Sequence, residues 1–218
     1  MCQAAVAAME VDGAALSLTT RPDRRQLAHA TDAVAALLDE QQFTLGEGPC
    51  IEAWASGGQV LVDDVASPAG LARWPVFAPT AVAAGARAIF AFPLQMGAIR
   101  LGSLTLYRAV PGAPTRDQIA NAVTMCHMAV GVMLLAGRAS PNGAASEPPS
   151  WPLGGPGQGR IEVYQATGMV AVQLGVGLQD AFAALRARAF TNGVSLSQLA
   201  RQVVDRHLRF HPDDSRDS

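Results

Sequence analysis

The sequence predicts an α+β domain with an antiparallel sheet, followed by a small all-α domain. Two apolar runs, Ala86–Gln95 and Arg100–Arg108, are joined by the short turn Met96–Ile99 and indicate a β-hairpin. Residues 139–160 are rich in Pro, Gly and Ser, as is typical of a linker. Three short amphipathic helices separated by glycine turns follow. The predicted boundaries are a domain at 1–138, a linker at 139–160, a helical domain at 161–211 and an acidic tail at 212–218.

Strands and helices are mixed along the first domain, which indicates a sheet covered by helices. The expected elements are a helix at Cys2–Met9, strands at Ala14–Thr20 and Gln26–Ala30, a helix capped by Asp32 and ending at Glu40, a short helix through Trp54, a strand at Gln59–Val65, a helix near Trp74–Ala84, the hairpin, and a helix from Thr115 to Arg138.

The segment Ile119–Gly137 has no Asp, Glu, Lys or Arg and is long enough to raise the question of a membrane span. Its apolar residues alternate four and three apart, as in a helix–helix seam. The seam contains Ile119, Val123, Cys126, Val130, Met133 and Gly137, and a second stripe contains Ala122, Met125, Ala129, Val132 and Ala136. We therefore expect no membrane span. We expect the Thr115–Arg138 helix to pack on its own domain and on a second copy of the chain, forming a homodimer.

Charge is distributed unevenly along the chain. The 218 residues are 50% hydrophobic and 16% charged, and the net charge is only −2. Residues 160–211 nevertheless hold six arginines against three acidic residues, a local charge of +3. Such an asymmetry is typical of a module that binds a polyanion, although a solvated basic surface is the simpler alternative. All sixteen basic residues are arginine, whose planar fork suits phosphate groups.

The C-terminal helices have clear boundaries in the sequence. A helix is expected at Ile161–Leu174, and Gly193 suits the left-handed end of the second helix. Ser195 and Gln198 form a capping box for the third helix. The apolar stripe of the second helix contains Leu178, Ala181, Phe182, Leu185 and Ala189, and the inner face of the third contains Leu196, Leu199, Ala200, Val203 and His207.

These helices resemble an ANTAR domain. The resemblance is carried by Ala166, Gly168, Met169, Ala181, Phe182, Leu185, Arg186, Ala200 and Val203. ANTAR domains are RNA-binding modules of bacterial antitermination regulators. The resemblance implies binding of stem-loops in nascent transcripts, which prevents terminator formation and acts indirectly on the RNA polymerase transcription complex.

The first domain is similar to the GAF domains fused to ANTAR modules in actinobacteria. The similar segments are LGEGPC (Leu45–Cys50), RWPVF (Arg73–Phe77) and AIFAFPLQMGAIRLGSLTLYR (Ala88–Arg108). This resemblance implies a sensor domain, whose signal the sequence does not identify.

Candidate RNA contacts are Arg186 and Arg188 on the second helix and Arg201 on the third, because arginines bind phosphates and stack on unpaired bases. Ala166 and Gly168 are small enough for a backbone to approach the first helix, or for that helix to pack tightly. Family members often carry Lys where this chain has Thr167, which puts one phosphate contact in doubt.

The sequence predicts no enzyme, no cofactor and no metal site. Cys2, Cys50 and Cys126 lie far apart without C-x-x-C spacing, which fits a reducing cytoplasm. Cys50 follows Pro49 near a helix start and is a redox candidate, although a buried apolar cysteine is the default. Asp63 and Asp64 imitate the acidic pair of a receiver domain, but a receiver also needs a lysine and the chain has none. The pair is expected to cap the following loop.

Three other interpretations fit the same sequence. Three short helices with a basic bias also suit a DNA-binding helix-turn-helix regulator. The helices could instead be a protein-interaction module with no nucleic-acid target. A small-molecule-binding or redox protein with a vestigial tail is the third alternative.

Overall fold

The computed structural model describes residues 1–21, 24–97, 99–138 and 158–211. The chain divides into two compact units. The N-terminal unit comprises Met1–Thr20 and Leu27–Gly154, and the C-terminal unit comprises Arg21–Gln26 and Gly155–Ser218. Residues 139–157 of the expected linker and the acidic tail at 212–218 lie outside the described residues.

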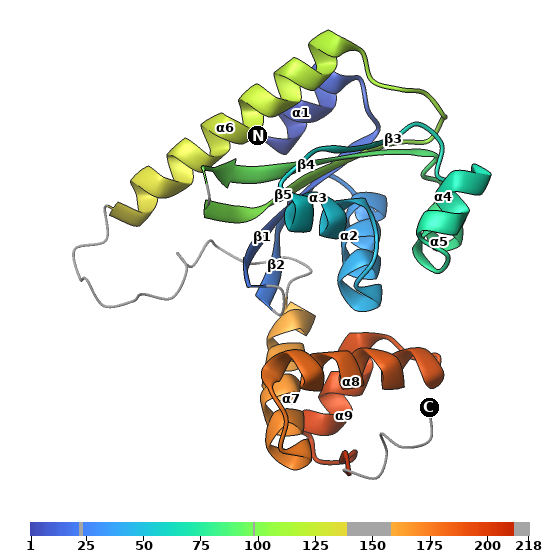
Figure 1. The fold of residues 1–218 in the computed structure, drawn as a ribbon, viewed down its shortest axis with the longest axis vertical. Helices are drawn as coiled ribbons and strands as arrows, with labels where there is room; N and C mark the ends of the chain where they lie inside the picture. Colours follow the sequence, from blue (N-terminus) through green and yellow to red (C-terminus); the bar gives the residue numbers. More distant parts are fainter. Residues whose placement is uncertain (22–23, 98, 139–157, 212–218) are drawn as a thin grey trace. The chain divides into compact units, whose positions relative to one another are not determined.

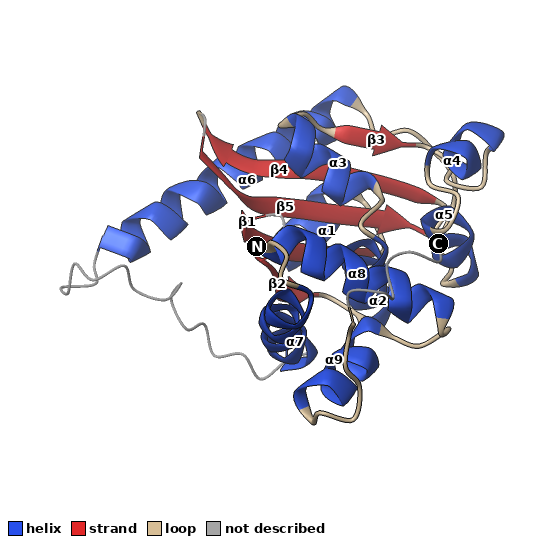
Figure 2. Cartoon of the chain, turned by 60° about the horizontal axis from the view of Figure 1, so that its bottom comes forward, coloured by secondary structure: helices blue, strands red, loops and turns tan. Residues whose placement is uncertain are grey.

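The N-terminal unit is a five-stranded sheet between two layers of helices. The strands are β1 (Gly13–Arg21), β2 (Arg24–Ala30), β3 (Val60–Val62), β4 (Ala88–Met96) and β5 (Ile99–Arg108). Their order is β2-β1-β5-β4-β3, and β1–β5, β5–β4 and β4–β3 pair antiparallel (Figure 2). Helices α1 (Cys2–Met9) and α6 (Arg116–Arg138) cover one face, and α2 (Ala33–Leu45), α3 (Pro49–Ser56), α4 (Pro68–Arg73) and α5 (Phe77–Ala83) cover the other (Figure 1). The predicted fold class is confirmed.

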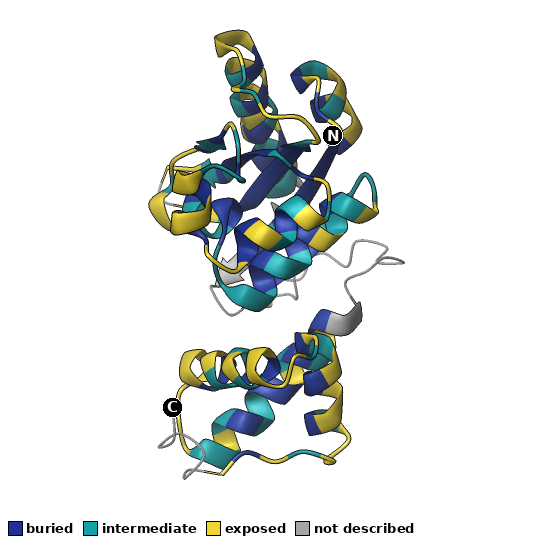
Figure 3. Cartoon of the chain, turned by 90° about the vertical axis from the view of Figure 1, so that its right-hand side faces the viewer, coloured by how far each residue is buried: buried dark blue, intermediate teal, exposed yellow. Residues whose placement is uncertain are grey.

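Both faces of the sheet are buried. Side chains alternate along a strand, so β4 sends Ile89 and Ala91 into the core under α2 to α5, and Phe90 and Phe92 into the core under α1 and α6. The central strands are accordingly buried along most of their length (Figure 3). A sheet covered on both sides explains the apolar runs from which the strands were predicted.

The hairpin is confirmed, since β4 and β5 pair antiparallel and Met96 pairs with Ile99. Helix α2 ends at Leu45, five residues beyond the predicted Glu40. The polar residues at its end are buried because tertiary partners satisfy them. Ser17 Oγ donates to Asp39 Oδ1 at 2.6 Å, and the amide of Cys50 donates to Gln42 Oε1 at 2.8 Å.

One further strand of this unit was predicted too long, and one helix was missed. Strand β3 contains only Val60–Val62, not Gln59–Val65, because it pairs with β4 over those three residues alone. Helix α4 was not predicted. Ser67 caps it by accepting from the amide of Gly70 at 3.1 Å, and Pro68 begins it.

The LGEGPC loop fixes the positions of three helices. Gly46 ends α2 in the left-handed conformation, with φ 70°, and Pro49 begins α3. Between them, the Glu47 carboxylate accepts from the amides of Val76 and Phe77, at 2.9 and 2.7 Å, and so caps the start of α5. The loop is therefore a structural connection.

The two apolar stripes predicted on α6 are only partly buried, and Met128, which belongs to neither stripe, is exposed. Ala122, Cys126 and Val130 are buried against the sheet, whereas Met128 and Val132 are 59% and 61% exposed. Val132 belongs to the second stripe, and its packing on a second copy of the chain stays a prediction. Within the described ranges, no single helix is long and apolar enough to cross a membrane. The helix pair 160–174 and 178–191 meets that test only jointly, with a bend of 105°.

The C-terminal unit consists of α7 (Gln158–Leu174), α8 (Leu178–Thr191) and α9 (Leu196–Val204). Helix α7 begins three residues before the predicted start at Ile161. The capping box is confirmed. The amide of Gln198 donates to Ser195 Oγ at 3.2 Å, and the amide of Ser195 donates to Gln198 Oε1 at 3.1 Å. The predicted core stripes of α8 and α9 are buried, apart from Leu178 and His207.

The inner position predicted for His207 was wrong. Helix α9 ends at Val204, and Arg206 adopts a left-handed conformation with φ 61°, so His207 leaves the helical face and is exposed. Phe210 is buried further along the chain, and its amide donates to Gln173 Oε1 at 2.9 Å.

Candidate nucleic-acid interface

Arg186 lies on α8, one turn after Phe182. Its guanidinium carbon is 4.9 Å from the centroid of the Phe182 ring. Its Nε is buried and has no hydrogen-bond partner among the described residues. Partial burial lowers the pKa of Arg186, because loss of solvent penalises the charged form. The guanidinium is thus held as a plane against an aromatic ring, a position from which it can bind a phosphate or stack on a base.

Arg188 faces a different side of the same helix. Two residues along a helix turn the side chain by about 200°, so Arg186 and Arg188 cannot share one face. The Arg188 guanidinium carbon lies 5.0 Å from the centroid of the Phe210 ring. Arg188 therefore also packs against the segment that follows α9.

Arg201 lies on the exposed side of α9 and pairs with a carboxylate of α7. The distance from Arg201 Nη2 to Glu162 Oε2 is 3.2 Å, and the Arg201 side chain is 64% exposed. The acid beside Arg201 is therefore Glu162, which lies 39 residues earlier in the chain. Because an exposed pair contributes little stability, a phosphate can replace the carboxylate at low cost.

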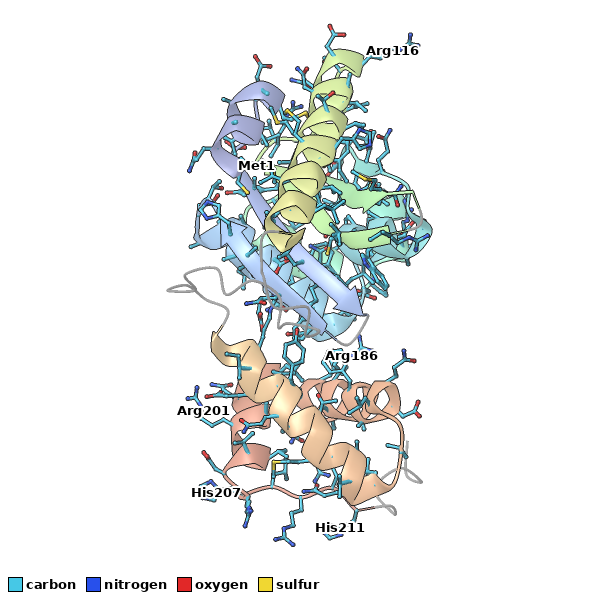
Figure 4. The ribbon with its side chains drawn as sticks, turned by 90° about the vertical axis from the view of Figure 1, so that its left-hand side faces the viewer. Met1, Arg116, Arg186, Arg201, His207 and His211 are labelled. Atoms are coloured by element: carbon cyan, nitrogen blue, oxygen red, sulfur yellow. The ribbon has the colours of Figure 1, made fainter. Side chains whose placement is uncertain are left out.

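The three predicted arginines do not form one patch. Figure 4 shows Arg186 and Arg201 projecting from different helices on separate sides of the C-terminal unit. Arg206, His207 and Arg209, which follow α9, are also exposed. An RNA bound to this unit would meet cations distributed over several sides, which suits contact with the backbone of a folded hairpin.

The small residues of α7 have different environments. Ala166 is fully buried, which supports the packing role and weighs against direct contact with RNA. Gly168 is half-buried, and a Cβ added there would meet no heavy atom within 4 Å. Open space at Gly168 is compatible with a close backbone approach. Thr167 is 4% exposed, and its hydroxyl donates to the Val163 carbonyl at 2.7 Å, so it offers no exposed donor at this position.

One exposed aromatic residue was missed. Phe190, on the last turn of α8, is 64% exposed. The signal was present in the sequence, because Phe190 falls outside the apolar stripe of that helix. An aromatic residue on the polar side of a basic helix is unusual enough to be noted.

Cys2, Cys50 and Cys126, the cysteines of the N-terminal unit, are all buried. Cys50 is the second residue of α3, as predicted, but its side chain is fully buried. Its redox role stays a prediction. Burial raises the pKa of the Cys126 thiol to about 12, and burial also raises the pKa of Cys2. In the parts of the chain that the structure describes, no group of three or more His, Cys, Asp or Glu side chains could hold a metal ion.

The acidic pair after β3 has a structural role. Asp64 accepts from Arg87 Nε and Nη2 at 3.1 and 2.9 Å, and from the amide of Ala66 at 3.0 Å. The hydrogen bond from Arg87 lowers the pKa of Asp64. The prediction that these aspartates cap the following loop is confirmed.

A polar layer lies on the face of the sheet under α2. Ser17 and Thr105 point to this face and are 1% and 4% exposed, and Ser17 donates to the buried Asp39. Thr105 Oγ1 has no hydrogen-bond partner among the described residues. A buried hydroxyl without a partner is uncommon, and it marks the least satisfied point of this core.

The topology of the N-terminal unit defines a GAF-like domain. It resembles the GAF domain region of a protein from Geobacter sulfurreducens PCA, with a TM-score of 0.50, 12% identity, and coverage of 62% of this chain and 88% of that chain. The GAF domain of an Acinetobacter phosphoenolpyruvate-protein phosphotransferase matches with a TM-score of 0.48 and 17% identity, over 64% of this chain and 81% of that chain. The GAF-B domain of DevS from Mycobacterium smegmatis matches with a TM-score of 0.45 and 14% identity, over 63% of this chain and 90% of that chain. At these identities the likeness concerns the fold alone.

The C-terminal unit is identified more specifically. Residues 158–204, which span α7 to α9, match the family model of the ANTAR domain. The chain is therefore a GAF-like domain followed by an ANTAR domain, as the sequence predicted. No curated protein matches the chain.

Proposed function

We propose that this protein is an RNA-binding antitermination regulator in which the GAF-like domain senses a signal and the ANTAR domain binds stem-loops in nascent transcripts. The match of residues 158–204 to the ANTAR family carries the proposal. The stacked guanidinium of Arg186 and the exposed Arg201 support it, because both can bind phosphate. The protein then acts as a regulator, without a catalytic role.

The proposed mechanism is competition between RNA hairpins. Binding stabilises a hairpin that shares sequence with a terminator, so the terminator does not form and polymerase continues. Phosphate contacts release counterions, which makes the affinity depend steeply on salt. The protein affects the transcription complex only indirectly, through the RNA that it holds.

A homodimer through α6 would allow two ANTAR domains to bind two stem-loops. Met128 and Val132 support this arrangement, since they are exposed one turn apart on the side of α6 that does not face the sheet. Linking two binding sites raises the apparent affinity without new contacts. A signal in the GAF-like domain would act by changing this dimer.

The test is binding and readthrough with the full-length protein. Transcripts crosslinked to the protein in its host supply the RNA, and single-round transcription of the same leaders measures readthrough. Arg186→Gln should weaken hairpin binding and lower readthrough, because it removes one phosphate contact. The matched control is Arg116→Gln, the same charge change at an exposed residue of the N-terminal unit. Equal binding by both variants would contradict the role of Arg186, and absence of any crosslinked hairpin would overturn the function.

DNA binding is the second candidate. Four residues separate α8 from α9, the turn contains Gly193, and the exposed side of α9 carries Gln198, Arg201 and Gln202. This arrangement is also compatible with a helix-turn-helix. Competition between hairpin RNA and duplex DNA at equal ionic strength separates the two candidates. We expect the hairpin to displace the duplex.

A further inference from the structure

We propose that Phe190 is a base-stacking residue, whose ring receives one unpaired base from the loop of the bound hairpin. This inference rests on the proposed RNA-binding function and adds to it a specific contact. Loop bases of RNA are commonly recognised by stacking on aromatic side chains and on guanidinium planes.

Phe190 differs from the other two phenylalanines of α8 to Phe210 in how exposed its ring is. Phe182 and Phe210 are 6% and 4% exposed and lie in the core, whereas Phe190 is 64% exposed. The same side of α8 carries Ala183 and Ala187, which are exposed and too small to cover the ring from along the helix. The ring of Phe190 is therefore open to a flat ligand.

The second step concerns charge. Phe182, Arg186 and Phe190 are spaced four residues apart, so they follow one another along the same side of α8. Arg186 is already stacked on Phe182, one turn before Phe190. The acid on this helix is Asp180, ten residues before Phe190 and about 15 Å away along the axis. A base on Phe190 would thus bring its phosphate toward a cation and away from the carboxylate.

The third step concerns the size of the apolar surface. Along α8, the residues three and four positions before Phe190 are Ala187 and Arg186, and neither is a large apolar side chain. A stable protein interface needs roughly 800 Å² from each partner. A single ring on a polar and small-residue surface suits one nucleobase, whose π-face it matches, better than a second protein.

The experiment uses the full-length protein and a pool of hairpins with a constant stem and a randomised loop. The hairpin that the wild type enriches most serves as the probe for all variants. We expect Phe190→Ala to weaken binding about tenfold to a hundredfold, as for loss of one stacked base. Phe190→Trp should retain the affinity. Val172→Ala is the matched control, since Val172 is 84% exposed on α7 and its loss should change the affinity less than twofold.

The salt dependence distinguishes stacking from charge. The slope of log K against log salt should be the same for Phe190→Ala and the wild type, whereas Arg186→Gln should reduce it by about one phosphate contact. A 2-aminopurine placed at each loop position should reveal one position whose fluorescence falls on binding to the wild type and to Phe190→Trp, but not to Phe190→Ala. Circular dichroism of each variant verifies folding.

The outcomes separate this inference from the function on which it rests. If the wild type enriches a hairpin and Phe190→Ala binds it with the same affinity and the same fluorescence change, stacking is overturned while the proposed function stands. If Phe190→Ala alters only the oligomeric state, the ring contacts a second copy and stacking is again overturned. If the wild type enriches no hairpin, the proposed function fails and the stacking contact fails with it.

Discussion

The two units use arginine in different ways. In the N-terminal unit, Arg108 donates to the Met9 carbonyl at 2.8 Å and to the Glu10 carbonyl at 3.1 Å, and Arg100 donates to the carbonyls of Trp54 and Ala55 at the end of α3. In the C-terminal unit, the guanidinium groups of Arg186 and Arg188 lie over rings. An arginine that caps a helix end uses its N–H groups to donate hydrogen bonds to backbone carbonyls. One held by a ring is positioned by a contact that uses none of its N–H groups.

The contrast is not complete. Arg108 also lies over the Phe90 ring, at 5.4 Å, and Arg73 over the Trp74 ring, at 4.7 Å. Arg73 also pairs with Glu52, and Arg108 also donates to Gln118 Oε1 at 3.1 Å. Stacking alone therefore does not identify a ligand-binding arginine. The useful criterion is stacking combined with the match of the surrounding helices to a nucleic-acid-binding family.

In the N-terminal unit, the backbones of β1 and β5 approach closely at Gly102. A substitution there is expected to have the largest effect on stability. Gly102 in β5 faces β1, and a Cβ there would lie 1.9 Å from the Ser17 carbonyl oxygen. We expect Gly102→Ala to destabilise the N-terminal unit by about 3 kcal/mol, because the strands must separate to admit the methyl group. Urea unfolding followed by tryptophan fluorescence measures this, because Trp54, Trp74 and Trp151 all belong to the N-terminal unit and the C-terminal unit contains no tryptophan.

Gly131→Ala is the matched control in the same unit. Gly131 lies in α6 with no heavy atom within 4 Å of its Cβ position, so alanine should be neutral or slightly stabilising there. An equal midpoint for both variants would show that β1 and β5 tolerate side chains at their closest approach.

A smaller effect is expected at alkaline pH, where buried acids of the N-terminal unit ionise. Burial raises the pKa of Cys126 from 9.0 to about 12, and burial with the nearby Asp32 raises the pKa of Tyr107 from 10.0 to about 12. Their folded pKa values exceed the unfolded ones, so the stabilisation is present below pH 9 and is lost as the pH rises from 9 to 12. Cys126 alone should cost ~2 kcal/mol between pH 8 and 10.5.

The same urea titration at pH 8 and at pH 10.5 checks the loss. Cys126→Ala removes one of these ionising groups and should lose less stability over this interval than the parent. If the free energy of unfolding falls by the same amount in the parent and in the variant, the thiol of Cys126 does not contribute to the alkaline sensitivity.

The smallest effect concerns the C-terminal unit. Gly168 lies inside α7 with open space around it, so Gly168→Ala should stabilise the helix by about 1 kcal/mol. If the glycine serves a close approach of RNA, hairpin binding should weaken although the fold is more stable. Thermal unfolding and hairpin affinity, measured together, separate the two roles. Unchanged affinity would remove Gly168 from the interface.

Much of the fold could be predicted from local patterns. The β4–β5 hairpin, the helix at Cys2–Met9 and the Ser195–Gln198 capping box depend on residues close in sequence, and all three were confirmed. The start of α4 is local in the same way, because Ser67 and Pro68 are a standard helix start.

The candidate site was less accessible to prediction. Arg186 was chosen for its position in the family pattern, and the ring beneath it, Phe182, lies one turn away on the same helix. The partner of Arg201 is Glu162, 39 residues earlier, which only the packing of α9 on α7 brings close. The exposure of His207 also depended on a left-handed residue that the helical pattern does not reveal.

The sequence by itself determined the order of the units, most helix and strand positions, and the family of the last three helices, because these follow from periodicity, caps and spacing along the chain. Tertiary structure alone decided that α2 extends to Leu45, that Asp39 and Gln42 are buried, and that the arginines of the ANTAR domain lie on separate sides. The reason is that a polar or charged side chain has no fixed place in a local pattern. Its burial or exposure depends on which partner the fold brings to it.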